Sequence, residues 1–176
     1  MIVRDTEIDG LKIIDIEPLR DDRGFFARSF CRDEFLKHNL EYEIAQCNLS
    51  KNVHKGTLRG MHYQVTPHEE VKMVRCIQGA IFDVAIDLRK DSVTYLQWMG
   101  FELHADNHRM LYVPKGCAHG YQTLEDNTTV SYMVTESYHP ECERAVRWND
   151  PSFNIRWPLP TPILSEKDSR SPDFVP

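Results

Sequence analysis

Side-chain character alternates with a period of two along much of this sequence, and that pattern most constrains the fold. In segment 80–88 (AIFDVAIDL) every second residue is apolar, and the positions between them include two aspartates. The first set is Ala80, Phe82, Val84, Ile86 and Leu88, and the second is Ile81, Asp83, Ala85 and Asp87. Successive side chains of a strand point to opposite faces, so the segment predicts a strand with one packed face and one partly polar face.

Three further segments alternate in the same way, at 72–79, 108–114 and 128–135. Turn-forming residues separate them, in the stretches RKDS, HADNH, VPKG and LEDNT. In VPKG, Pro114 and Gly116 stand where a tight turn places them. Helical signals are confined to 32–39 and 164–168. Many short strands at regular spacing predict an all-β fold, a sandwich or barrel whose interior is lined by every second residue.

Length and composition fit a single soluble domain over residues 1–176, with 41% hydrophobic and 27% charged residues. The net charge of −6 argues against a sequence-independent nucleic-acid partner. No apolar run approaches the roughly 20 residues of a membrane helix, and residues 1–10 lack the apolar core of a signal peptide. Five scattered cysteines without a C-x-x-C pair predict reduced thiols in a cytoplasm rather than a disulfide framework.

The stretch GTLRGMHYQ, residues 56–64, places Arg59 and His62 within one predicted strand. Such groups are costly to bury without partners. Strict alternation would direct the two side chains to opposite faces, unless Gly60 marks a bulge that resets the register. The alternative for His62 is a hydrogen-bonded structural histidine, which the residues alone leave open.

Four other polar residues have both a structural and a chemical interpretation. Lys72 begins a strand, where lysines are usually solvated, and His119 follows a turn, where a capping role is common. Tyr132 lies among β-branched neighbours and fits a core position with its hydroxyl at an edge. Asp168 follows Ser165 in an S-x-x-D helix-start pattern and fits a capping residue.

Several kinds of site find little support in the sequence. The eight histidines are scattered singly and no H-x-H pair occurs, which argues against a mononuclear metal site. There is no G-x-S-x-G nucleophile turn, no G-x-G-x-x-G and no Walker loop. The sequence therefore predicts neither a serine hydrolase nor these nucleotide-binding loops.

Six segments together resemble the dTDP-4-dehydrorhamnose 3,5-epimerase family. They are DDRGFFARSF, QCNLSKNVHKGTLRGMHYQ, VKMVRCIQGAIFDVAIDLRKDS, VPKGCAHGYQTL, VSYMVTESYHPECERAVRWNDP and ILSEKD. The resemblance implies a jelly-roll β-sandwich of the cupin type with a few short helices, a homodimer, and cytoplasmic carbohydrate metabolism without metal or organic cofactor. The implied substrate is a nucleotide-linked 4-keto-6-deoxyhexose, inverted at C3 and C5 through an enolate.

The resemblance also implies a role for each candidate catalytic residue. His62 matches the base and Asp168 its carboxylate partner, while Lys72 matches the cation beside the enolate oxygen. Tyr132 matches the acid that returns a proton to the opposite face. A carboxylate that fixes the imidazole tautomer, and a cation at a developing negative charge, suit such chemistry.

The substrate-binding residues follow by the same resemblance. They are Arg23, Arg28, Gln46, Cys47, Asn48, Arg59, His119, Tyr138, Glu143 and Lys167. Tyr138 matches a position that stacks on the base, and the segment around Arg23 matches one that reaches the partner subunit's site. Arg28 stands where relatives commonly carry Glu.

Three alternatives to the 3,5-epimerase remain open from the sequence. The nearest is an enzyme that inverts only C3, or only C5, of a related nucleotide keto sugar. The second is a cupin that binds sugar nucleotides without catalysis, and the third is a metal-dependent cupin enzyme.

Overall fold

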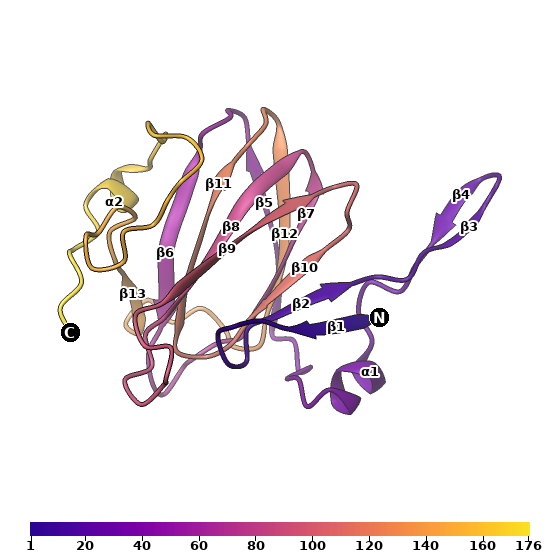
Figure 1. Ribbon diagram of the computed structural model, residues 1–176, viewed down its shortest axis with the longest axis horizontal. Coiled ribbons are helices and arrows are strands. Elements are labelled where there is room, and N and C mark those ends of the chain that lie inside the picture. Colours follow the sequence, from indigo (N-terminus) through magenta and orange to yellow (C-terminus); the bar gives the residue numbers. More distant parts are fainter.

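The computed structural model describes residues 1–176 and consists mainly of antiparallel strands arranged in two facing sheets (Figure 1). The six-stranded sheet has the order β1-β2-β10-β7-β12-β5. Its strands are β1 (Ile2–Asp5), β2 (Lys12–Asp15), β10 (Met110–Val113), β7 (Lys72–Gln78), β12 (Thr128–Val134) and β5 (Gln46–Asn52). Three of the four predicted alternating segments thus form the adjacent strands β10, β7 and β12 of this sheet.

The second sheet has five strands in the order β13-β6-β11-β8-β9. They are β13 (Glu143–Ala145), β6 (Leu58–Gln64), β11 (Cys117–Thr123), β8 (Ala80–Asp87) and β9 (Trp98–His104). A separate hairpin, β3 (Leu19–Asp21) with β4 (Gly24–Phe26), projects away from the two sheets (Figure 1). The helices are α1 (Arg32–Lys37) and α2 (Glu166–Ser169), at the two predicted helical segments.

The main core lies between the two sheets and includes alternate residues of the central strands. Val74 and Cys76 of β7 and Val130 of β12 belong to one buried cluster with Ile81 and Ala85 of β8. Because Ile81 and Ala85 share a face with Asp83, the partly polar face of segment 80–88 is the interior one. Asp83 is therefore directed between the sheets, and it is fully buried.

The other face of β8 is buried as well, beneath the C-terminal part of the chain. Val84 and Ile86 form a second cluster with Val146 and Phe153, against which Trp157 packs. Residues 146–174 thus cover the outer face of the five-stranded sheet, and they carry α2 to the edge of β6 (Figure 1). This covering accounts for a strand that is apolar on one face and still buried on both.

The fold class predicted from the sequence, an all-β jelly-roll sandwich with a few short helices, is confirmed. The turn at 113–116 forms as expected, since Gly116 has φ of +76° and the Cys117 N–H donates to the Pro114 carbonyl. Neither helix has the length and apolar character required to cross a membrane.

Candidate active site

A register break in β6 brings Arg59 and His62 to the same side of the sheet. His119 of β11 pairs with His62, and Tyr121 pairs with Arg59, so two steps along β11 match three along β6. One extra residue therefore resets the alternation of β6, as expected for a bulge. The break lies at Gly60, whose φ is +126°. A Cβ there would lie 2.6 Å from the Gly120 Cα, so only glycine permits this close approach of the strands.

His62 is bound to a buried carboxylate supplied by the C-terminal segment. Its Nε2 lies 2.7 Å from the Asp168 Oδ1, and the Asp168 side chain is only 5% exposed. Burial alone would raise the pKa of Asp168, but hydrogen bonds from His62 and Ser165 outweigh burial and hold the pKa below its ordinary value. The capping interpretation of Asp168 is also correct, since its backbone N–H donates to the Ser165 Oγ.

Lys72, the first residue of β7, is held by two oxygen acceptors. Its Nζ lies 3.0 Å from the Glu70 Oε1 and donates to the His62 carbonyl at 3.2 Å. The Lys72 and Glu70 side chains are only 14% and 11% exposed, so this is not the solvated strand-end lysine that is most common. An ammonium group has three N–H donors, and one remains for a further acceptor.

Tyr132 lies beside Lys72 on the interior face of the six-stranded sheet, since Val134 of the same strand pairs with Lys72 and Tyr132 with Val74. Its ring packs against the main core, as the sequence predicted. Burial, followed by the negative charge of Glu70, raises the pKa of Tyr132 above its ordinary value of 10.0. The phenol is therefore protonated at neutral pH and can donate a proton.

A second histidine–carboxylate pair lies deeper between the sheets. The His119 Nε2 is 2.7 Å from the Asp83 Oδ1, and the two side chains are 10% and 0% exposed. His119 was among the predicted binding residues, but Asp83 was not. The signal that could have identified Asp83 was an acidic side chain on the interior face of a strand. Glu70 was also missed, because a glutamate in a polar turn carries no such signal.

Two adjacent cavities meet at His62, Lys72 and Tyr132, which line both. The larger has a volume of about 400 Å³ and is also lined by Gln46, Asn48, Tyr63, Gln64, Glu70, Val134, Tyr138 and Glu143. The smaller, of about 220 Å³, is also lined by Ser50, Arg59, Val74, His119, Tyr121 and Asp168. All four predicted catalytic residues thus face one connected region between the sheets.

The rim of the larger cavity carries a chain of polar contacts. The Tyr138 Oη donates to the Glu143 Oε2 at 2.9 Å, and the Lys167 Nζ lies 2.6 Å from the same carboxylate. Gln46 accepts a hydrogen bond from the Tyr138 N–H at 2.9 Å. Four predicted binding residues are therefore joined in one network.

Four predicted binding residues do not line these cavities, and one of them is Lys167, which contacts Glu143 at the rim. Arg23 is on the β3–β4 hairpin, is 89% exposed and pairs with Asp21 at 2.6 Å. Arg28 follows that hairpin and pairs with Glu34 at 3.1 Å. Cys47 is exposed on β5, where the alternate residues Gln46 and Asn48 face the larger cavity.

Only one group of three side chains brings potential metal-ligating atoms within 4.8 Å of one another. It consists of His68, Glu136 and His139, none of which lines either cavity.

Comparison with known proteins places the chain beside one group of sugar-nucleotide enzymes. The family model described as dTDP-4-dehydrorhamnose 3,5-epimerase matches residues 5–175. The dTDP-4-dehydrorhamnose 3,5-epimerase of Shigella flexneri is 42% identical over 176 residues, which cover 99% of this chain and 97% of that protein.

Solved structures agree with this similarity. The dTDP-4-dehydrorhamnose 3,5-epimerase from Bacillus anthracis str. Ames, with TDP and PPi bound, superposes with a TM-score of 0.96 at 42% identity, covering 98% of this chain and 99% of that one. The dTDP-6-deoxy-D-glucose-3,5-epimerase from Legionella pneumophila, in complex with dTDP-4-keto-L-rhamnose, gives 0.92 at 38% identity and covers 98% and 92%.

Proposed function

Because this chain belongs to the dTDP-4-dehydrorhamnose 3,5-epimerase family, we propose that it converts dTDP-4-dehydro-6-deoxy-D-glucose to dTDP-4-dehydro-L-rhamnose. It is an isomerase that inverts the two carbons flanking the C4 ketone. The observation that carries the proposal is the meeting of His62, Lys72 and Tyr132 at the junction of the two cavities. These side chains supply a base, a cation and an acid.

His62 acts as the base. Its Nε2–H donates to Asp168, which leaves the Nδ1 lone pair free to take the proton from the carbon next to the ketone. The Asp168 carboxylate then stabilises the imidazolium that forms. A general base at this step contributes about 10²- to 10⁴-fold to the rate.

Lys72 stabilises the enolate. When the C–H bond breaks, its electron pair moves into the new carbon–carbon double bond, and the carbonyl π electrons move to the C4 oxygen. The third N–H of the Lys72 ammonium donates to this oxygen, because Glu70 and the His62 carbonyl hold the other two donors. A fixed cation in a cavity with little water is worth several kcal/mol at such a charge.

Tyr132 completes the inversion. The Tyr132 hydroxyl gives its proton to the opposite face of the same carbon, and the C4 ketone forms again. Solvent then reprotonates the phenolate and takes the proton from the imidazolium. The raised pKa of Tyr132 favours this acid form at neutral pH.

The larger cavity takes the nucleotide, in this proposal, and the smaller takes the sugar. Tyr138 stacks on the base, while Gln46, Asn48 and Glu143 contact it or the ribose. Arg59 and Lys167 bind the diphosphate, a role that suits their positive charge. His119, fixed by Asp83, contacts the sugar from the inner end of the cavity.

We also propose a cytoplasmic homodimer in which the hairpin that carries Arg23, with Arg28 just after it, reaches the partner's site. The hairpin projects from the body and exposes Leu19 and Phe26, each 72% accessible. Leu49 on β5 is also 72% exposed, on the outer face of the six-stranded sheet. The exposed apolar side chains of the hairpin and of β5 lie on two separate surfaces, and both surfaces would be buried if they packed against a second copy of the chain.

The experiment that tests this function is turnover of dTDP-4-dehydro-6-deoxy-D-glucose in deuterated water. Each inversion replaces a carbon-bound hydrogen by one from solvent, so the product is expected to carry deuterium at both C3 and C5. Deuterium at C3 alone would identify a 3-epimerase and at C5 alone a 5-epimerase. Tight binding of the nucleotide sugar without any exchange would identify a non-catalytic binding protein.

A further inference from the structure

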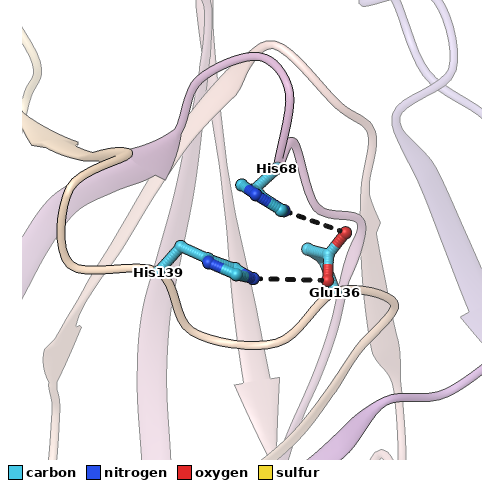
Figure 2. A group of neighbouring side chains, drawn as sticks. All are labelled: His68, Glu136 and His139. Atoms are coloured by element: carbon cyan, nitrogen blue, oxygen red, sulfur yellow. Dashed lines mark ion pairs between the residues drawn. The ribbon is translucent and has the colours of Figure 1, made fainter.

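Two loops outside the cavities bring a pair of histidines against one glutamate. His68 lies in the connection from β6 to β7, and Glu136 and His139 lie between β12 and β13. The His68 and His139 rings stack with centroids 3.4 Å apart and an interplanar angle of 11°. Figure 2 shows that each ring directs a nitrogen toward the Glu136 carboxylate. The His68 Nδ1 is 3.5 Å from Oε2, and the His139 Nε2 is 3.9 Å from Oε1.

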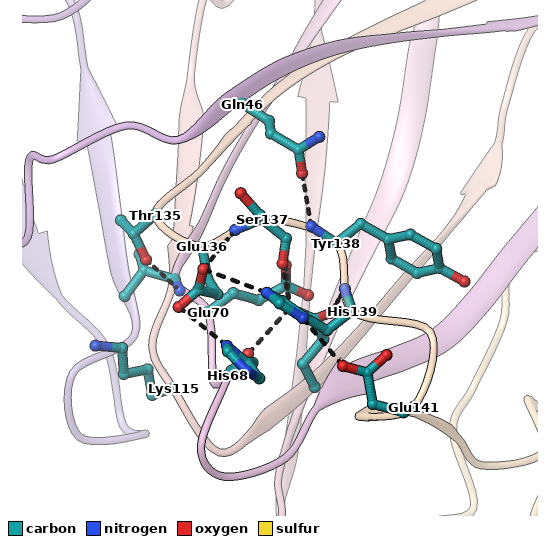
Figure 3. Close-up of polar contacts among 12 residues, drawn as sticks. Gln46, His68, Glu70, Lys115, Thr135, Glu136, Ser137, Tyr138, His139 and Glu141 are labelled. Atoms are coloured by element: carbon teal, nitrogen blue, oxygen red, sulfur yellow. Dashed lines mark hydrogen bonds and ion pairs between the residues drawn. The ribbon is translucent and has the colours of Figure 1, made fainter.

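The far nitrogen of His139 has its own carboxylate partner. The His139 Nδ1 lies 3.1 Å from the Glu141 Oε1 (Figure 3). A proton on Nδ1 donates to Glu141 and leaves the Nε2 lone pair directed at the cluster. Metal-binding histidines typically donate their other N–H to a carboxylate in this way, which fixes the tautomer and raises the basicity of the ligating nitrogen.

The His68 nitrogen that faces the cluster has no hydrogen bond of normal geometry, and the Glu136 Oε2 lies 3.5 Å from it. The His68 Nδ1 is buried, although the residue as a whole is partly accessible, and it forms no hydrogen bond. A buried polar atom without a partner is unusual and costs free energy. A cation between His68 and Glu136 would satisfy it.

The backbone of both loops is fixed before any ligand arrives. The buried Gln64 side chain donates to the His68 carbonyl at 3.0 Å and accepts from the His139 N–H at 2.6 Å. The Thr135 Oγ1 accepts a hydrogen bond from the Val71 N–H at 2.9 Å, which adds a second tie between the same loops. The protein itself therefore fixes the backbone from which both imidazoles extend, and binding need only reorient the two side chains.

We propose that His68, His139 and Glu136 form a binding site for a divalent transition metal of the zinc class. Zinc binds imidazole nitrogen and carboxylate oxygen at about 2.0–2.2 Å, which separates tetrahedral ligand atoms by about 3.3–3.6 Å. The ligand atoms here all lie within 4.8 Å of one another. To share one ion, the stacked rings must tilt apart so that the ion lies in the plane of each ring. Each side chain is about a third exposed, which leaves the fourth position open to water.

The local charge supports a dication. With both imidazoles acting as neutral ligands, the carboxylates of Glu136 and Glu141 give the cluster a charge of −2. The ion would join the loop that carries Glu70 to the loop that carries Tyr138. It would thus be a structural metal beside the cavity, distinct from a catalytic one.

The test is zinc binding by purified, tag-free protein treated with a chelator. Titration with Zn²⁺ against a chromophoric chelator is expected to give one equivalent per chain. H68A and H139A are each expected to weaken binding about 100-fold, and E141Q about 10-fold through loss of its contact to His139. Co²⁺ in place of zinc is expected to produce the visible bands of a four-coordinate ion, and these should disappear in H139A.

The matched control is H104A, because His104 also lies beside a glutamate, 3.3 Å from Glu102, but has no second histidine. Zinc affinity should be unchanged in this variant. H139Q removes the metal ligand while keeping a polar side chain, and circular dichroism would verify that each variant is folded. Absence of a stoichiometric zinc site would overturn the proposal. So would a site that survives H68A and H139A but is lost in H62A.

Discussion

At the residue scale, two histidine–aspartate pairs of equal length face the same region but differ in access. Both bonds measure 2.7 Å, yet the His62 side chain is 27% exposed and that of His119 is 10% exposed. Of the two histidines, only His62 lines both cavities. Since a base must reach its substrate, this difference in access favours His62 as the base and leaves His119 a binding role.

Replacing His62 tests that assignment. H62N is expected to lower kcat about 10²- to 10⁴-fold because it removes the base, and circular dichroism should show that the variant is folded. The control is H54A, whose exposed histidine lines neither cavity. Equal turnover by H62N and wild type would contradict the assignment.

Asp168 should contribute to stability in a pH-dependent way. Its pKa lies below the ordinary 3.8 in the folded protein, so the folded state binds fewer protons there than the unfolded state. The contribution is therefore complete above the unfolded pKa and is lost as the pH falls through the folded pKa. D168N is expected to lose about 1.5–3 kcal/mol of unfolding free energy at pH 6. Urea denaturation should show the difference from wild type shrinking toward pH 3, and a pH-independent difference would refute the prediction.

Glu70 should help keep Tyr132 protonated. Burial is the main reason that the Tyr132 pKa is raised, and the charge of Glu70 adds to it. E70Q removes the charge and keeps the shape, so the Tyr132 pKa should fall. The measurement is near-ultraviolet absorbance of tyrosinate against pH, with the corresponding Y132F curve subtracted. E69Q, at the adjacent glutamate, should leave the curve in place, and an unchanged curve in E70Q would count against the account.

At the element scale, the bulge in β6 is the feature on which the site depends. G60A should lose at least about 2 kcal/mol of unfolding free energy. The φ of Gly60 is +126°, and the Cβ of an alanine there would lie 2.6 Å from the Gly120 Cα and 2.8 Å from the His119 carbonyl oxygen. G24A is the matched control, since Gly24 has φ of +132° with nothing within 4 Å. Denaturant unfolding of both variants separates the cost of a strained φ angle, which both share, from the cost of the clash with β11, which only G60A has. Similar losses of unfolding free energy in the two variants would mean that the close approach of β6 to β11 is unimportant.

The strands could be predicted from the sequence, but the layers that cover them could not. Alternation located β7, β8, β10 and β12 because its period is local. Nothing local showed that residues 146–174 would bury the outer face of β8, since that segment has no regular period. The partly polar face of β8 was predicted correctly. That this face is the interior one follows from residues 146–174, which bury the apolar face of β8 on the outside of the sheet.

The candidate site shows the same division. The Gly60 bulge was expected from one residue, and it is confirmed. The family resemblance supplied His62, Asp168, Lys72 and Tyr132 as a set, and their roles stay predictions. The cluster of His68 and His139 could not be foreseen, because 71 residues separate the two histidines and only the neighbouring loops bring them together.

At the scale of the whole molecule, the proposed dimer makes Arg23 a residue of the partner's site. R23A and H62A should each be poorly active at low substrate concentration. Co-expressed, they should form mixed dimers in which one site has both an intact His62 and the partner's Arg23. Activity is expected to recover in these mixed dimers. The control is a mixed dimer of H54A and H62A, in which both chains keep Arg23. Its activity sets the level expected when one of the two sites is intact.

A single result would exclude that arrangement. If R23A lowers activity but mixed dimers recover none, Arg23 acts within its own chain.

The dimer itself is tested by sedimentation. L49D is expected to shift the dimer toward monomer, because it places a charge on the exposed apolar surface. A wild-type chain that sediments as a monomer at all concentrations would exclude the dimer.

The central claim is that His62 and Tyr132 act on opposite faces of the carbons beside the ketone. The most direct measurement is deuterium incorporation by Y132F in deuterated water, followed in the recovered nucleotide sugar. With the base intact and the acid removed, His62 should still exchange the proton and return it to the same face. Deuterated substrate of unchanged configuration is therefore expected. Inverted product at the wild-type rate from Y132F, or continued exchange in H62N, would contradict it.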